Sequence, residues 1–136
     1  MRLRHDESGM VGKVIVIWLL LVALLGVVVL DGASIMFTKF RLDDAAGLAA
    51  SAAATAFRNG STVAASCDAA QQAALDDDAG IAFPANIAKW CKVDMQTGEF
   101  TITLHKQAKT ILAGRLSFTK SYARVVQKET AGPATL

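Results

Sequence analysis

The residues of this chain that could do chemistry are few: two cysteines, two histidines and one run of three aspartates. Cys67 and Cys91 both follow the long apolar stretch near the start of the chain. In an oxidising compartment such a pair forms a disulfide, which is what we expect here, and the alternative is two buried free thiols. The pair cannot hold a structural zinc ion unaided, because that metal takes four ligands.

The three consecutive aspartates are Asp76, Asp77 and Asp78. An EF-hand calcium loop needs oxygen ligands at alternating positions around a central glycine, and this run lacks that pattern. Acids at the end of a helix oppose its dipole, so we expect the run to fray into a solvated turn. The sequence therefore predicts no metal and no cofactor.

No nucleophile motif, phosphate-binding glycine loop or HExxH pattern is present, which disfavours an enzyme with a small-molecule substrate. His5 and His105 are far apart in sequence, and neither lies in a recognisable catalytic pattern. The net charge is +2, and the part from residue 59 onward has eight Lys or Arg against seven Asp or Glu. This balance gives nucleic-acid binding no electrostatic basis.

The elements that must position these residues begin with an unbroken apolar run over residues 14–30, flanked by Lys13 and Asp31. Its 17 residues would extend roughly 26 Å as a helix, close to the hydrocarbon thickness of a bilayer. We predict a single transmembrane helix after a leader of residues 1–13. Arg2 and Arg4 in that leader favour a cytoplasmic N-terminus and an extracytoplasmic C-terminal part.

A cleaved secretory signal is the competing interpretation of the same run. The run is longer than the usual apolar region of a signal, and the residues after it offer no good small-x-small cleavage site. We therefore expect the helix to be retained as an anchor that contacts membrane lipid.

The helix is predicted to continue as an Ala-rich extension over residues 31–58 and to stop at Asn59 and Gly60. Small apolar residues recur along it at helical spacing, which allows another backbone to approach closely. Two interpretations of this face stay open: it contacts another subunit, or it packs on the chain's own domain. Its residues are Leu42, Ala45, Ala46, Ala49, Ala52, Ala53 and Ala56.

Residues 59–130 are predicted to form a small extracytoplasmic α+β head. A second helix follows a Ser61-Thr62 cap and ends near residue 78. Alternating residues predict a β-hairpin around the turn at 94–99, and residues 117–128 predict a third, edge strand. The fold class is thus α+β, with one long N-terminal helix, a second helix and an antiparallel sheet of about three strands, and residues 131–136 are expected to be a disordered tail.

Several segments together resemble the N-terminal part of TadE/TadG-like proteins. These are Asp-Glu-Ser-Gly at 6–9, the apolar helix, Leu-Asp-Gly at 30–32 and the Ala-rich stretch at 41–52. The resemblance implies a pilin-like fold without a cofactor. It also implies a minor pilin or pilus-assembly component of a Tad (Flp, type IVc) pilus, or of a related type II/IV-like secretion apparatus. Such a protein lies in the bacterial cell membrane or in the pilus, with other pilin-like subunits or platform proteins as partners.

The resemblance also raises prepilin-type cleavage between Gly9 and Met10. Cleaved pilins usually have Glu five residues after the cleaved Gly, where its carboxylate can pair with a neighbouring subunit's N-terminal amine. That position is Val14 in this chain, and Lys13 precedes it. We therefore expect the uncut, TadG-like form.

A function of another class stays open. The chain could be a membrane-anchored extracytoplasmic binding domain that captures a ligand or a cell-wall component with its sheet.

Overall fold

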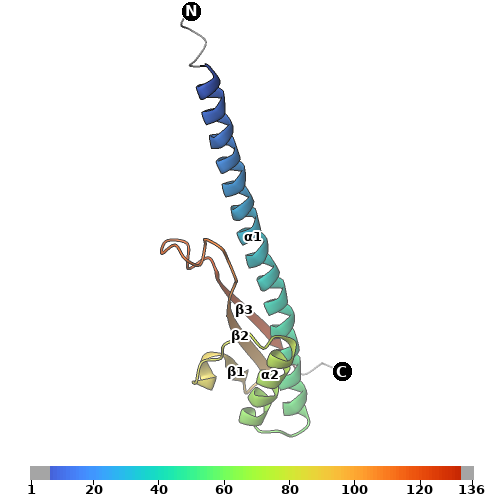
Figure 1. Ribbon diagram of the computed structural model, residues 1–136. Helices are drawn as coiled ribbons and strands as arrows, with labels where there is room; N and C mark the ends of the chain where they lie inside the picture. The colour runs from blue at the N-terminus through green and yellow to red at the C-terminus, as the bar shows by residue number, and fades with distance from the viewer. Residues whose placement is uncertain (1–6, 133–136) are drawn as a thin grey trace, which may run out of the picture.

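The computed structural model describes residues 7–132, and it shows one long helix with a small head packed along its C-terminal half (Figure 1). The predicted α+β fold class is confirmed. The helices are α1 (Glu7–Arg58), α2 (Val63–Asp77) and the short 3-10 helix η1 (Ile87–Lys89). The strands are β1 (Cys91–Asp94), β2 (Glu99–Gln107) and β3 (Arg124–Ala131).

Helix α1 has 52 residues and begins within the predicted leader. A rise of ~1.5 Å per residue makes it about 78 Å long. It ends where Gly60 adopts a φ of +90°, a conformation that costs glycine little. The N–H of Gly60 donates to the carbonyl of Phe57, and that of Ser61 donates to Ala56, so the last carbonyls of the helix are satisfied.

Helix α2 begins at the predicted cap, where the Thr62 hydroxyl accepts a hydrogen bond from the backbone N–H of Ala65 at 3.2 Å. The expected fraying of the aspartate run is wrong for Asp76 and Asp77, which both remain helical. Asp78 is the C-cap residue, and its N–H still donates to the carbonyl of Ala74. The unfavourable interaction of these carboxylates with the helix dipole is therefore too small to unfold the last turn of α2.

The three strands form one antiparallel sheet in the order β1-β2-β3. Val93 pairs with Phe100 across the predicted hairpin, and Gly98 in its turn has a φ of +71°. Side chains alternate along β2, with Phe100, Ile102 and Leu104 buried in the core. The sheet thus presents one face to the helices, as the period-two pattern predicts.

The predicted third strand is wrong at both ends: residues 117–128 were expected, whereas β3 is Arg124–Ala131. Residues 108–123 instead form a loop of successive turns. Most of their backbone N–H groups bond within the loop or to a side chain of α1, and none of these bonds joins a strand ladder. Ala131, expected in the tail, is paired with Phe100, and residues 133–136 lie outside the described residues.

The core lies between the C-terminal half of α1, helix α2 and the inner face of the sheet. Trp90 and Phe100 are its two largest fully buried side chains. The Phe57 ring meets the Phe100 ring edge to face at 5.4 Å, and Phe83 meets Trp90 in the same way at 4.8 Å. These large rings fill the space that the short alanines of α1 leave open.

Candidate functional site

The N-terminal half of α1 has no protein cover. Its large apolar side chains are exposed on all sides of the helix, from Met10 at 70% through Trp18 at 66% to Leu30 at 59%. Within the described residues, α1 is the one helix long and apolar enough to cross a membrane. Because water would strongly disfavour so much bare apolar surface, this half of the helix needs lipid or other helices around it.

Tertiary packing on α1 begins at Asp31, directly after the apolar run. Its side chain is buried, and its carboxylate accepts three backbone hydrogen bonds from the 108–123 loop. The donors are the N–H groups of Ile111 at 2.6 Å, Leu112 at 2.9 Å and Ala113 at 2.9 Å. The bonds from Ile111 and Ala113 lower the pKa of Asp31, and the loss of hydration opposes them only in part. The charged carboxylate therefore holds the loop against the helix.

Two further polar contacts attach the loop and the sheet to α1. One turn beyond Asp31, the Ser34 hydroxyl donates to the carbonyl of Lys109 at 2.6 Å. Farther along, the side-chain amide of Gln127 donates to the carboxylate of Asp43 at 2.6 Å. The loop and β3 are thus fixed along α1 from residue 31 to residue 43.

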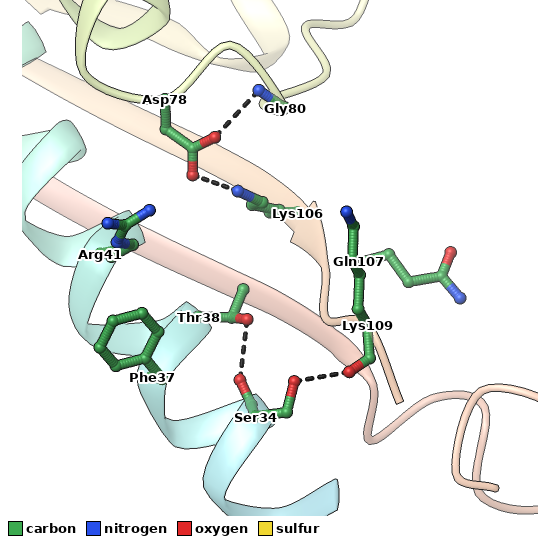
Figure 2. Close-up of a pocket in the computed structure, with 9 residues that line it drawn as sticks. All are labelled: Ser34, Phe37, Thr38, Arg41, Asp78, Gly80, Lys106, Gln107 and Lys109. Atoms are coloured by element: carbon green, nitrogen blue, oxygen red, sulfur yellow. Dashed lines mark hydrogen bonds and ion pairs between the residues drawn. The ribbon is translucent and has the colours of Figure 1, made fainter. Parts of the chain in front are cut away.

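A pocket of about 500 Å³ lies between α1 and the end of β2 (Figure 2). Asp78 forms an ion pair with Lys106 there and accepts a hydrogen bond from the N–H of Gly80 at 2.9 Å. Burial raises the pKa of Asp78, but the bonds from Lys106 and Gly80 outweigh it and leave the pKa below its usual value. The lining residues are Ser34, Phe37, Thr38, Arg41, Asp78, Gly80, Lys106, Gln107 and Lys109.

The aspartate run thus supplies one carboxylate to an internal ion pair. Among the described residues, no group of three His, Cys, Asp or Glu side chains could hold a metal ion. His105 is half-buried on β2 opposite Val126, and His5 lies outside the described residues. The pocket therefore combines basic and acidic groups without a recognisable catalytic arrangement.

The predicted small-residue face lies inside the head. Leu42, Ala45, Ala46, Ala49 and Ala53 are each fully buried. Ala52 and Ala56 are half-buried beside them. The small side chains let α2 and the sheet approach α1 closely. The buried residues of this face thus pack inside the head, and an intersubunit role for the face stays a prediction.

The predicted disulfide is confirmed: Cys67 of α2 is bonded to Cys91 of β1, and both residues are buried. Gly9 and Met10, the candidate cleavage pair, lie in the exposed N-terminal part of α1. The disulfide joins α2 to β1 in the head, at the opposite end of the fold from Gly9 and Met10 (Figure 1).

Sequence reasoning missed the part played by Asp31. An acid directly after an apolar run simply marks the membrane boundary in most sequences, and its loop partners lie 80 to 82 residues away.

Within the described residues, the fold combines one candidate membrane span with a disulfide-linked α+β head. Residues 9–56, about a third of the chain and all within α1, match the Tad family model, described as "Putative Flp pilus-assembly TadE/G-like". The resemblance read from the sequence is therefore confirmed over this segment, and together with the candidate span it supports a pilus-assembly-related membrane protein. No curated protein and no solved structure matches the chain.

Proposed function

We propose that this protein is a membrane-anchored, TadE/TadG-like minor pilin or assembly component of a Tad/Flp pilus or a related secretion apparatus. It acts by helix–helix association and has no catalytic role. The N-terminus is cytoplasmic, the apolar half of α1 crosses the membrane once, and the head lies outside.

The observation that carries this proposal is the bare apolar half of α1. It lies within the segment that matches the pilus-assembly family, and the head covers only the part from Asp31 onward. Most of the alanine face is already covered by the head. We infer that association uses the apolar run, where exposed apolar residues surround the whole helix and Gly26 and Ala23 also permit close approach of another helix.

We further propose that the leader is not cleaved. Val14 offers no carboxylate to a neighbouring subunit's new N-terminal amine, so cleavage would leave that amine unpaired in an apolar bundle. Mass spectrometry of the protein from the membrane fraction tests this. An intact N-terminus is expected, and Met10 as the first residue would overturn this part of the proposal.

Deletion of the gene, complemented by variants, tests the function itself. Leu25→Trp keeps the run apolar but changes its shape, and Leu48→Trp is the matched control because Leu48 is similarly exposed on the C-terminal part of the same helix, at 51% against 64%. We expect the deletion to reduce pilus assembly or secretion, Leu48→Trp to restore it and Leu25→Trp to restore it poorly. Normal assembly and secretion in the deletion strain would contradict the proposal and favour a membrane-anchored binding domain.

A further inference from the structure

Residues 109–122, the central part of the loop between β2 and β3, combine exposed apolar side chains with basic ones. Ile111, Leu116, Phe118 and Tyr122 expose 52%, 41%, 75% and 73% of their surfaces. The same loop carries three basic residues, Lys109, Arg115 and Lys120, and no acidic residue. Exposed aromatic and aliphatic side chains beside cations are the composition of segments that bind the surface of an anionic bilayer.

The loop is held in a defined shape by its own backbone. The N–H groups of Arg115 and Leu116 both donate to the carbonyl of Leu112, and those of Thr119 and Lys120 both donate to Leu116. The Thr119 hydroxyl donates to the carbonyl of Ala113 at 2.9 Å. These bonds pair much of the loop's polar backbone internally, while its large apolar side chains remain exposed.

The loop's position along α1 is fixed by two residues. Its residues 111–113 bond to Asp31, the first residue after the apolar run, and its Lys109 bonds to Ser34. These two anchors are three residues apart, or about 4.5 Å along the helix axis. The headgroup layer on each side of a bilayer is roughly 5–8 Å thick. When the apolar run spans the hydrocarbon core, both anchors therefore lie within the headgroup layer.

The direction of the loop agrees with this placement. In Figure 1 the orange segment between β2 and β3 leaves the sheet toward the N-terminal half of α1 and extends to one side of the helix. A segment directed sideways at the end of a membrane span lies along the bilayer surface.

We propose that residues 109–122 form an interfacial loop that inserts Leu116, Phe118 and their apolar neighbours into the outer leaflet, with Arg115 and Lys120 on lipid phosphates. The ligand is the anionic bilayer surface itself. This inference rests on the proposed membrane placement of α1. It gives the head a fixed depth and orientation, which a single helix alone would leave free to rotate.

Spin labels at three single cysteines in the full-length, disulfide-bonded protein test the loop. The protein is reconstituted into vesicles of phosphatidylcholine and phosphatidylglycerol, and collisions with oxygen and with a water-soluble nickel complex report the depth of each label. Phe118→Cys is the test position, and Leu20→Cys in the apolar run is the reference for membrane insertion. Met95→Cys is the matched control, since Met95 is 73% exposed but lies in the β1–β2 turn at the other end of the sheet.

We expect the label at 118 to meet oxygen several-fold more often, relative to nickel, than the label at 95, and the label at 20 to lie deeper than both. Equal nickel access at 118 and 95, with the label at 20 in lipid, would overturn the loop proposal alone. Nickel access at 20 would overturn the membrane placement and with it the loop proposal. A label at 118 that becomes shielded only when other pilus proteins are added would show that a protein partner covers the loop, which would also overturn the proposal.

Discussion

Ile111 donates its backbone N–H to the carboxylate of Asp31 at 2.6 Å, joining two residues that are 80 positions apart in sequence. Asp31 is where the exposed half of α1 ends and the packed half begins. This contact and its two neighbours therefore fix where the head lies relative to the proposed membrane span.

The first prediction concerns that attachment. Asp31→Ala removes the acceptor for the three N–H groups of residues 111–113, so their amides should exchange with deuterium much faster than in the wild type. Hydrogen-exchange mass spectrometry of the detergent-solubilised protein measures this. Asp44→Ala is the control, because Asp44 is an exposed acid of the same helix. Unchanged exchange in residues 111–113 of Asp31→Ala would show that the loop is held by other contacts.

The second prediction concerns acid stability. The pKa values of Asp31 and Asp78 are both lowered in the folded protein from the ordinary value of 3.8. A carboxyl with a lowered pKa stabilises the fold at pH values above 3.8, and this contribution is lost as the pH falls through the folded-state pKa. The contribution of these two groups to the midpoint temperature of thermal unfolding in detergent should therefore be constant from pH 7 to pH 5. The midpoint should fall on further acidification. The acid-induced fall should be smaller in Asp78→Asn, and an equal fall in that variant would remove Asp78 from the explanation.

The third prediction concerns the alanine face. Ala49→Leu should destabilise the head by about 1–3 kcal/mol, because three added carbons must fit into a filled core. Ala64→Leu, the same change at an exposed position of α2, should alter the free energy of unfolding by less than about 0.5 kcal/mol. Urea unfolding followed by circular dichroism of the head compares the two variants. A fully stable Ala49→Leu protein with defective pilus assembly would instead favour an intersubunit role for this face.

The fourth prediction concerns the disulfide. Cys67 and Cys91 are 24 residues apart, and closing a loop of this length raises the free energy of the unfolded chain by about 3.5 kcal/mol. The double variant Cys67→Ser, Cys91→Ser should lose about this much stability in urea unfolding. Reductant should lower the stability of the wild type toward that of the variant and leave the variant unchanged. Wild-type unfolding that is insensitive to reductant would contradict the bond's contribution.

The sequence predicted the elements whose signals are local. The apolar run, the Thr62 cap, the Gly60 stop and the Gly98 turn each depend on neighbouring residues, and all four lie where they were expected. The disulfide was also predictable, because the chain has only two cysteines to pair.

The features that sequence reasoning missed depend on contacts between distant residues. The residues 117–123 favour a strand by composition, yet the Asp31 carboxylate binds the preceding segment and turns the chain away from the sheet. The alanine spacing is equally suited to an internal or an external partner, and the burial of most of this face inside the head is visible only in the folded chain. Which machine the exposed helix joins depends on other chains, so it stays a proposal.

The central claim is that the exposed half of α1 is the surface through which the protein assembles. A photo-crosslinking amino acid at Leu25, in cells that make the whole apparatus, tests it most directly, with Leu48 of the same helix as the comparison position. The account predicts adducts from position 25 to another protein with an apolar N-terminal helix, and few or none from position 48. Adducts from position 48 alone, or none to protein from any position in the apolar run, would contradict it.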